Sequence, residues 1–450
     1  MSGFAGRVHL IGIGGDGMTA LAQLLREGGA TVSGSDIRDS SRLSALRSWA
    51  EVHVGHRAEN MPDRVDAVVY SSAISLGNAE IEAARGIPRW PRLPALGEVV
   101  RGRDLVAVVG THGKTTTATW AAHLLGTVTG EGGYYVGGEV PGRPSATLGK
   151  GKPFVAEVDE SDGRFVGLSP QVAVLTSVDT DHVGRYGGFS GLRRAFSRFA
   201  ARAGRVAVCA DDPIALDAVR SVRRPVTYGF SAGAELRAVG MECCRERSTF
   251  ELLLRGKSVG AVEVPGPGPH NVRNALGALA AGVLLGIPVR DLVPALASAS
   301  RPRRRLEVLE ENGYLVVDDY AHHPTEVAAG LTALRLGWPN RRIVAIFQPH
   351  RYSRTQALAG AFGTVLSRAD RVVVSRVYPA FERPIPGVTG REVAEAIRGA
   401  GGWAVYRDSL GAALDAAAEA IEPGDVVACF GAGDIWKLAR EMARGLSCGS

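Results

Sequence analysis

The chain of 450 residues has few cysteines, and their spacing matches no metal site or disulfide framework. The five are Cys209, Cys243, Cys244, Cys429 and Cys448, and no CxxC pair occurs among them. This argues against a thiolate metal site and indicates ordinary thiols in a reducing compartment.

Long apolar runs are also missing. No stretch approaches the roughly 20 residues that a membrane-spanning helix needs, and the first residues lack the charged-then-apolar pattern of a secretory signal. We therefore expect a cytoplasmic protein without a membrane partner. Hydrophobic residues make up 45% and charged residues 22%, which fits a globular protein of several domains.

Lysine is scarce as well, with five lysines among 52 basic residues. The one dense basic run is "RPRRR" at 301–305. A net charge of +6 carried mostly by scattered arginines suits a small polyanionic ligand better than a nucleic-acid groove, so we expect no nucleic-acid partner.

What is present is an alternation of β-branched apolar runs with longer amphipathic stretches, in the first and last thirds of the chain. This alternation is typical of βαβ units and parallel sheets. Residues 235–264 alternate with a shorter period and predict antiparallel hairpins. We predict three α/β domains over residues 1–102, 103–301 and 302–450.

A first glycine loop follows the first predicted strand. Gly12, Gly14 and Gly17 match G-x-G-x-x-G, and Asp36 closes the next strand. The glycines permit a tight turn, the following helix start favours an anion, and the acid can bind a ribose hydroxyl. The pattern predicts a nucleotide with a pyrophosphate without singling out NAD; the alternative is a glycine-rich turn without a ligand. Asp16 places a carboxylate inside this loop, so we expect it to point outward or to weaken the site.

A second glycine loop, "GTHGKTTT", spans 110–117. Lys114 would reach the β- and γ-phosphates of a triphosphate, and the Thr115 hydroxyl would hold Mg²⁺. The standard pattern has glycine where this chain has Val108, so the loop is a shorter variant. The two loops together predict two ligands: a nucleotide-carried substrate in the first domain and ATP in the second.

Eleven segments then occur in an order that resembles the Mur ligases, nearly end to end. They are "GIGGDGM", "SGSD", "SSAI", "GTHGKTTT", "EVDESD", "DHVGRYGGF", "HNVRNALGALA", "DDYAHHPTE", "QPHRYSRT", "PIPG" and "GAGDIWK". The likeness is weakest over 200–265. "YAHHP" and "QPHRYSRT" resemble most closely the members of the family that add L-alanine.

The resemblance implies a Rossmann-like UDP-substrate domain, a central P-loop ATPase domain and a Rossmann-like C-terminal domain for the amino acid. It implies that L-alanine is joined to the lactyl carboxylate of UDP-N-acetylmuramate, with ATP and Mg²⁺, through an acyl phosphate, in peptidoglycan precursor synthesis. A monomer or homodimer is expected. Three alternatives stay open: a recycling ligase that adds a preformed tripeptide, an NAD-dependent oxidoreductase, and an inactive binder of muramyl nucleotides.

The resemblance also implies the site residues. Catalysis is assigned to Lys114, Glu157 and His182, and metal binding to Thr115, Glu157 and His182. The ATP site comprises Gly110, Thr111, His112, Gly113, Lys114, Thr115, Thr116, Asn274, Arg305 and Asp319. The UDP-substrate site comprises Gly12, Gly14, Gly15, Gly17, Asp36 and Ser71. The amino-acid site comprises Tyr320, His350, Arg351 and Arg354.

Some details follow from the chemistry of these residues. The adjacent Asp159, Glu160 and Asp162 would repel one another unless some are paired or solvated. Two arginines three residues apart can share one face and hold an amino-acid carboxylate. Departures from the family pattern are Asp16, Ser177 (usually asparagine) and Ala79 (usually proline). The segment His270, Asn271 and Asn274 is assigned by the resemblance to the adenine side, and His322 with His323 is weak evidence for a metal.

Overall fold

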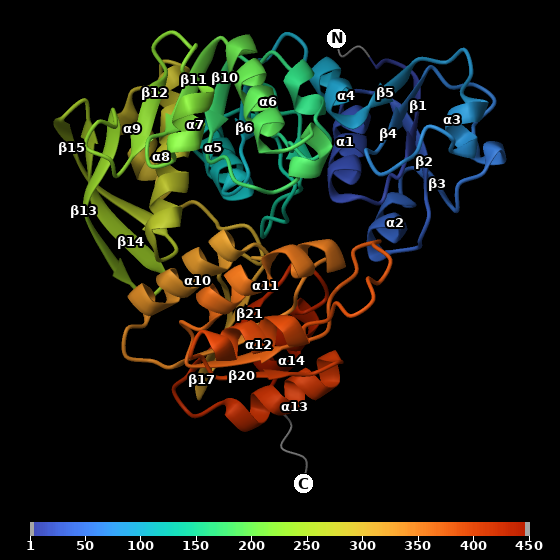
Figure 1. Cartoon of the computed structure of the whole chain (residues 1–450). Helices are drawn as coiled ribbons and strands as arrows, with labels where there is room; N and C mark the ends of the chain where they lie inside the picture. Colours follow the sequence, from blue (N-terminus) through green and yellow to red (C-terminus); the bar gives the residue numbers. More distant parts are fainter. Residues whose placement is uncertain (1–3, 446–450) are drawn as a thin grey trace. The chain divides into compact units, whose positions relative to one another are not determined.

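The computed structural model describes residues 4–445 (Figure 1). The chain divides into two compact units, described separately below. The first comprises residues 1–240, 250–263 and 272–302; the second comprises 241–249, 264–271 and 303–450. The predicted α/β class is confirmed, with two sheets formed mainly by the first unit and one by the second. The boundaries after residues 102 and 301 remain predictions. None of the described helices is long and apolar enough to cross a membrane.

The first sheet is parallel, with the strand order β3-β2-β1-β4-β5. Its strands are β1 (Arg7–Ile11), β2 (Thr31–Asp36), β3 (Glu51–Val54), β4 (Ala67–Tyr70) and β5 (Arg89–Pro91). Its helices are α1 (Asp16–Glu27), α2 (Ser41–Leu46), α3 (Ala79–Ala83) and α4 (Arg92–Val99), with the short helix η1 (Ala58–Asn60). The strand order reverses at β1, so the crevice at its carboxyl end is where such a sheet binds ligands.

The second sheet has ten strands in the order β15-β14-β13-β12-β11-β10-β6-β9-β7-β8. Those nearest the P-loop are β6 (Asp104–Val109), β9 (Pro153–Glu157) and β10 (Val172–Leu175). The others are β7 (Gly133–Tyr135), β8 (Ala146–Thr147), β11 (Arg205–Cys209), β12 (Val226–Gly229), β13 (Leu236–Cys244), β14 (Arg247–Leu254) and β15 (Lys257–Pro265). Strands β13, β14 and β15 are consecutive neighbours joined by two-residue turns, as the predicted hairpins require.

The helices associated with this sheet are α5 (Lys114–Thr129), α6 (Phe189–Arg202), α7 (Pro213–Ala218), α8 (Pro269–Leu284) and α9 (Val289–Leu296), with the short helices η2 (Arg164–Gly167) and η3 (Val183–Tyr186). One buried apolar cluster runs through both sheets of the first unit, from Leu10 and Leu96 to Phe165 and Phe196. The two glycine loops of this unit therefore rest on a shared core.

The third sheet lies in the second unit, with the order β16-β17-β21-β18-β19-β20. Its strands are β16 (Glu307–Asn312), β17 (Tyr314–Asp319), β18 (Ile343–Phe347), β19 (Arg371–Val374), β20 (Ala404–Tyr406) and β21 (Val426–Phe430); β16 alone runs antiparallel to its neighbour. The helices are α10 (Pro324–Gly337), α11 (Tyr352–Leu366), α12 (Arg391–Gly399), α13 (Leu410–Ala420) and α14 (Trp436–Ala443). Of the predicted amino-acid residues, Tyr320, His350 and Arg351 lie in short loops at the carboxyl ends of β17 and β18, and Arg354 lies in the first turn of α11.

Candidate active site

The first glycine loop connects the end of β1 to the start of α1. Gly12 has a φ of 82°, and a Cβ added there would lie 3.0 Å from the Cβ of Ser71, so this turn requires glycine. Gly15 is the N-cap of α1. The first amides of a helix lack partners inside it, and they suit an anion such as a diphosphate. The structure thus brings three predicted UDP-site residues together.

Asp36 stands at the carboxyl end of β2 and holds this loop in place. Its Oδ2 accepts a hydrogen bond of 2.9 Å from the amide of Gly14. A Cβ on Gly14 would meet the same oxygen at 3.0 Å. The carboxylate has lone pairs beyond this bond, so it can still accept a ribose hydroxyl as predicted.

Asp16 does not fill the anion cradle. Its carboxylate forms an ion pair with Arg42 of α2, and its side chain is 56% exposed. The neighbouring guanidinium balances its charge, and the exposure indicates that it faces solvent. Of the two alternatives that the sequence left open for Asp16, the exposure fits the outward-pointing one; its effect on binding stays a prediction.

Two residues that the sequence analysis missed connect the first glycine loop to the acidic segment 159–162 that follows β9. The Arg92 guanidinium donates to the Tyr135 hydroxyl at 2.6 Å, and this hydroxyl donates to the Gly17 carbonyl at 3.0 Å. Arg92 also lies 3.8 Å from the Asp159 carboxylate, beyond the end of β9. A Cβ on Gly17 would lie 2.5 Å from both partner side chains, which explains the third glycine of the motif. Neither residue lies in a motif, so no sequence signal identified them.

The second glycine loop follows β6 and has no room for side chains at either glycine. Gly110 has a φ of 143°, and its Cβ would lie 2.2 Å from the Thr176 hydroxyl; Gly113 has a φ of 81°, and its Cβ would lie 2.4 Å from Asn274 Oδ1. Val108 lies inside β6, paired with Glu157 and Val174 on the neighbouring strands. The missing glycine at that position therefore leaves the loop intact.

The segment after β10 fastens this loop from outside. Ser177 accepts the His112 amide on its hydroxyl and the Thr111 amide on its carbonyl, both at 2.9 Å. The Asp179 amide donates to the Thr111 hydroxyl at 2.9 Å. Because residues 176–179 serve the loop in this way, β10 ends at Leu175. Ser177, a departure from the family pattern, has a defined role here.

Lys114 lies at the start of α5, with its ammonium group held by oxygens. Its Nζ donates to the carbonyls of Gly110 and Thr111 at 2.6 and 3.1 Å, and it lies 2.9 Å from Glu160 Oε2. Burial alone would lower the pKa of Lys114, but Glu160 and Asp159 outweigh this effect and raise it. Burial raises the pKa of Glu160 to about 7, against the effect of Lys114. The lysine is therefore charged, and its ammonium group is held in a fixed position at the loop.

Two other acids of the segment 159–162, Asp159 and Asp162, also accept hydrogen bonds, as expected for carboxylates so close together. Asp159 accepts hydrogen bonds from the amide and hydroxyl of Ser161 at 2.9 and 2.8 Å. Burial would raise the pKa of Asp159, but Lys114 and Ser161 lower it on balance. Asp162 accepts the Arg164 amide at 2.9 Å. Asp159 and Asp162 thus have hydrogen-bond partners within their own segment.

Thr115 and Glu157 form the part of the site that fits a metal ion. The Thr115 hydroxyl donates to Glu157 Oε1 at 2.7 Å, and Glu157 Oε2 accepts the Gly137 amide at 2.6 Å. Adjacent hydroxyl and carboxylate oxygens are the donors that Mg²⁺ prefers. Thr116 follows in the first turn of α5. His182 lies after β10 with a φ of 57°, and its ring nitrogen is 3.7 Å from Asp181; its role as a ligand stays a prediction.

Asn274, on α8, lies against the phosphate loop. Its Oδ1 accepts the Thr117 hydroxyl at 3.3 Å, and it faces Gly113 as described above. This contact favours a role for Asn274 at the phosphate end of the nucleotide rather than at the adenine. Asn271 donates to the Pro267 carbonyl at 2.9 Å, which gives it a structural task in the turn before α8.

The remaining predicted ATP residues belong to the second unit. Asp319 ends β17 and accepts the amides of Ala321 and Leu306, each at 2.7 Å. Burial raises the pKa of Asp319 to about 6, although Arg305 opposes the shift. Arg305 lies over the ring of Tyr320 at 5.3 Å. The ribose and phosphate roles implied by the resemblance remain predictions for these residues.

The predicted amino-acid residues of the second unit come together around a line of rings. Tyr320 contacts His322 edge to face at 5.4 Å, His322 contacts His350 at 5.4 Å, and His350 stacks on Tyr378 at 5.6 Å. Arg354 lies 3.3 Å from the ring nitrogen of His350. The sequence analysis missed Tyr378 as a member of this group.

Arg351 is the N-cap of α11, and its backbone has a φ of 71°. Its amide donates to the Tyr378 carbonyl at 2.8 Å, which fixes this strained turn beside the rings. His323, by contrast, caps α10, because its ring accepts the Thr325 amide at 3.4 Å. The pair His322 and His323 thus has local structural partners.

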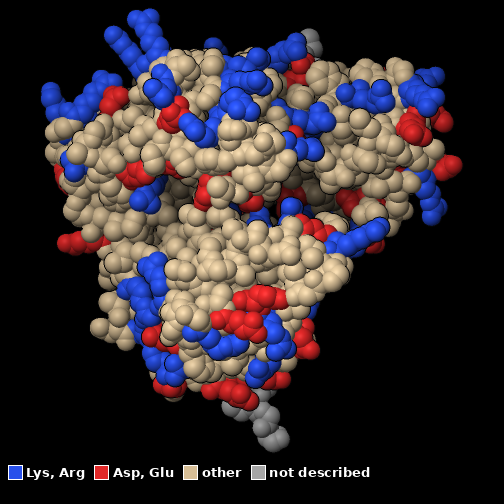
Figure 2. All heavy atoms as spheres, in the orientation of Figure 1, with Lys and Arg blue, Asp and Glu red and all other residues tan. Residues whose placement is uncertain are grey.

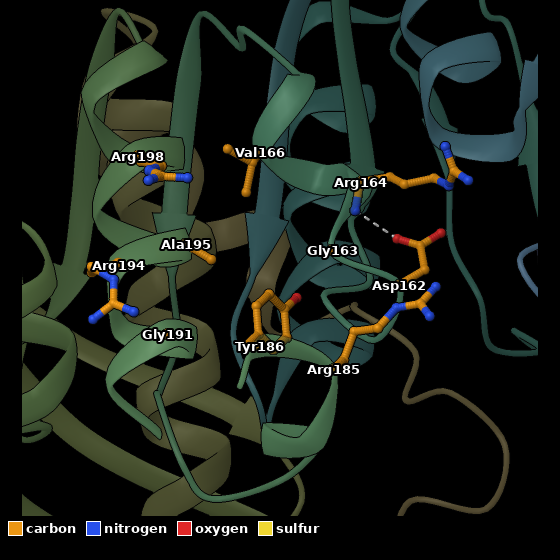
Figure 3. Close-up of a pocket in the computed structure, with 10 residues that line it drawn as sticks. All are labelled: Asp162, Gly163, Arg164, Val166, Arg185, Tyr186, Gly191, Arg194, Ala195 and Arg198. Atoms are coloured by element: carbon orange, nitrogen blue, oxygen red, sulfur yellow. Dashed lines mark hydrogen bonds between the residues drawn. The ribbon is translucent and has the colours of Figure 1, made fainter. Parts of the chain in front are cut away.

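A cavity of about 440 Å³ lies beside the acidic segment (Figure 3). It is lined by Asp162, Gly163, Arg164, Val166, Arg185, Tyr186, Gly191, Arg194, Ala195 and Arg198. None of the predicted site residues lines it, so this cavity is separate from the P-loop. Basic side chains on the visible face are interspersed with acidic and uncharged ones (Figure 2).

Comparison with protein families gives three matches along the chain. The Mur ligase family catalytic domain matches residues 7–104, the Mur ligase middle domain matches 108–282, and the Mur ligase glutamate ligase domain matches 304–433. Together these models account for most of the chain.

Individual relatives give the same result. The UDP-N-acetylmuramate–L-alanine ligase of Oleidesulfovibrio alaskensis is 41% identical, covering 98% of this chain and 99% of its own. The enzyme of that name from Solidesulfovibrio magneticus is 42% identical, covering 96% of each. The solved UDP-N-acetylmuramate-alanine ligase of Thermotoga maritima is 29% identical with a TM-score of 0.83, covering 97% of this chain and 98% of its own. A murein peptide ligase from Psychrobacter arcticus shares the fold, at 23% identity and a TM-score of 0.67, over 99% of both chains.

Proposed function

The chain belongs to the Mur ligase family, and we propose that it joins L-alanine to the lactyl carboxylate of UDP-N-acetylmuramate while ATP becomes ADP and phosphate. The observation that carries this proposal is the identity of 41% over 98% of the chain with a relative of that name. The P-loop geometry around Lys114, Thr115 and Glu157 supports an ATP-dependent reaction. The product would be a peptidoglycan precursor.

The chemistry needs two steps, because an amine does not attack a carboxylate. In the first, a lactyl carboxylate oxygen attacks the γ-phosphorus of ATP, and ADP leaves. In the second, the neutral amine of alanine attacks the acyl carbon, phosphate leaves, and the nitrogen loses a proton. Phosphoryl transfer depends on positioning and on charge neutralisation. Lys114 supplies a fixed cation for this purpose at the loop that would hold the phosphates.

Thr115 and Glu157 are the residues that would hold Mg²⁺, with His182 as a third candidate. When bound, the ion would neutralise the phosphate charge that develops during transfer. One carboxylate oxygen of Glu157 accepts a hydrogen bond from the Thr115 hydroxyl, and the other accepts one from the Gly137 amide. These two bonds orient the carboxylate without any ligand.

The two other substrates have distinct sites in this proposal. The loop from Gly12 to Gly17 with Asp36 and Ser71 would hold the UDP part of the sugar nucleotide. Tyr320, His350, Arg351 and Arg354 would hold alanine, with arginine on its carboxylate. A cytoplasmic location and a monomer or homodimer belong to the same proposal.

The recycling ligase that adds a tripeptide is the nearest rival, and the comparisons do not favour it. The structure of an alanine ligase matches at a TM-score of 0.83, whereas a murein peptide ligase matches at 0.67. An NAD-dependent oxidoreductase would have no use for the second loop.

Mass spectrometry of the product tests the proposal. Purified protein is incubated with ATP, Mg²⁺, UDP-N-acetylmuramate and isotope-labelled L-alanine. We expect a nucleotide heavier than the substrate by one labelled alanyl residue, and no such product without ATP. Binding of the sugar nucleotide without product formation would leave the inactive binder as the better description.

A further inference from the structure

A buried polar network lies beneath the first glycine loop and outside the G-x-G-x-x-G motif. Ser35 lies in the segment "SGSD", but the resemblance assigns no site role to any residue of this network. Glu80 of α3 and His9 of β1 are fully buried, as is Ser35 of β2. Glu80 Oε2 accepts the Ser35 hydroxyl at 2.6 Å and lies 3.2 Å from His9 Nε2. Burying a carboxylate away from solvent costs free energy, so a buried carboxylate is stable only where hydrogen-bond donors or positive charges surround it.

The other oxygen of Glu80 binds the segment after β3. Glu80 Oε1 accepts the Asn60 side-chain amide at 2.6 Å and the Arg57 backbone amide at 3.1 Å. His56 lies 3.7 Å from this oxygen, and its ring nitrogen is 2.9 Å from the Ser35 hydroxyl. One carboxylate thus connects β1, β2, α3 and the segment from Arg57 to Asn60.

Ser35 transmits this arrangement to the glycine loop. Its carbonyl accepts the amides of Gly12 and Ile13 at 2.8 and 3.0 Å. The next residue, Asp36, accepts the amide of Gly14 at 2.9 Å. Three successive loop amides are therefore fixed by the last two residues of β2. A shift of this strand end would break the bond from the Ser35 hydroxyl to the buried carboxylate.

We propose that Glu80 is a positioning residue for the nucleotide of the UDP-sugar substrate, acting through Ser35 on the loop from Gly12 to Gly14. The inference rests on the proposed function for the identity of the substrate. Glu80 need not touch the ligand. It keeps the loop in the shape that presents the start of α1 to a diphosphate, which lowers the ordering cost of binding.

The test is direct binding, measured by calorimetry with UDP-N-acetylmuramate, UDP and, separately, ADP. Glu80→Gln keeps the shape but puts an amide group among hydrogen-bond donors. Ser35→Ala removes the link and leaves the carboxylate its other partners. Each change should raise the Kd for both uridine nucleotides about tenfold or more, the effect of a lost bond to a charged group. The Kd for ADP should change less than about twofold, because the P-loop shares none of these contacts.

Ser33→Ala is the matched control. Ser33 lies on the same strand, buried, and contacts His9 Nδ1 at 2.9 Å, but no bond links its side chain to the loop. It should leave all three Kd values near the wild-type ones. The double variant Glu80→Gln with Ser35→Ala should bind no more weakly than the worse single variant, because both act through one link.

Unchanged Kd values for uridine nucleotides in Glu80→Gln or Ser35→Ala would overturn the inference. Equal losses for ADP and UDP, with a lower melting temperature, would overturn it too, because they would show a general structural defect. The readout is binding, so it stands apart from the ligation reaction. A wild-type chain that binds UDP-N-acetylmuramate but ligates nothing would refute the proposed function and leave this inference testable.

Discussion

Among single residues, Lys114 has a side chain that is held by several oxygen atoms of the predicted ATP site. Two loop carbonyls and the carboxylate of Glu160 surround its ammonium group. Such a group can favour a transition state because its orientation is set before the reaction starts. Its own removal need not unfold the chain, since the pKa of Glu160 is about 7 and this acid can take up a proton when its partner is lost.

Lys114→Ala should therefore lower the ligation rate at least about a hundredfold, as expected for the loss of a preorganised charge. The circular dichroism spectrum should stay that of the wild type. Phosphate release under saturating substrates measures the effect. Lys150→Ala, an exposed lysine outside the loops, is the control and should keep full activity. Near-normal turnover of Lys114→Ala would mean that ATP is not handled at this loop.

Asp16 is the second residue with a distinct consequence. It pairs with Arg42 at the edge of the first loop. Asp16→Ala would free this guanidinium and remove a negative charge near the expected diphosphate. We expect the Kd for UDP-N-acetylmuramate, measured by calorimetry, to stay equal or to fall. A weaker affinity in Asp16→Ala would show that the carboxylate itself contributes to binding.

At the scale of elements, the sequence predicted the two glycine loops well, because short motifs encode short turns. Glycine is required at 12, 110 and 113 by the backbone angles and by the neighbouring atoms. The links between elements could not be predicted in this way. Arg92 and Tyr135 lie 43 residues apart, and Glu80 meets Ser35 across 45. No local pattern pairs residues so far apart in the sequence, and only folding makes them partners.

The buried Glu80 beside the first sheet leads to a prediction about stability at low pH. Burial alone would raise the pKa of Glu80, but hydrogen bonds from His9, Ser35 and Asn60 lower it from 4.5 to about 2. A carboxyl group whose pKa is lower in the folded state than in the unfolded chain stabilises the folded state at pH values above its unfolded pKa, here 4.5. This contribution is lost as the pH falls toward the folded pKa of about 2. It amounts to at most about 3–4 kcal/mol, from about 1.4 kcal/mol per pH unit.

Hydrogen exchange of β2, corrected for the intrinsic effect of pH, measures this contribution. At pH 6 the wild type should protect β2 more than Glu80→Gln does. The difference should shrink steadily between about pH 4.5 and pH 2, where the carboxylate becomes protonated. A difference that is constant over this range would show that ionised Glu80 does not stabilise the sheet.

The turn into α11 leads to a prediction about the binding of L-alanine. Arg351 and Arg354 begin this helix beside the rings of His350 and Tyr378. Replacing either arginine with alanine should raise the KM for L-alanine at least about tenfold, because a charge-assisted bond is lost. The KM for UDP-N-acetylmuramate should stay near its wild-type value. Arg368→Ala, exposed beyond the far end of α11, is the control. Parallel increases in both KM values would refute an alanine-specific pocket.

At the scale of the whole molecule, the ordered sequence segments from "GIGGDGM" to "GAGDIWK" predicted the family, and the comparisons confirmed it across almost the full length. The periodicity of strands and helices was sufficient for the fold class. It could not predict how long β10 is, because the hydroxyls and amides of residues 176–179 hold the P-loop instead of extending the strand. Choices of this kind depend on contacts that no local pattern records.

The central claim is that this chain adds L-alanine, and a steady-state comparison of amines tests it most directly. Phosphate release is measured with ATP, UDP-N-acetylmuramate and, in turn, L-alanine, glycine, L-serine and the tripeptide L-alanyl-γ-D-glutamyl-diaminopimelate. We predict the highest kcat/KM for alanine. Glycine and serine should be used less well, because a small group changes discrimination by about 1–3 kcal/mol. A preference for the tripeptide would contradict the account and identify the chain as a recycling ligase.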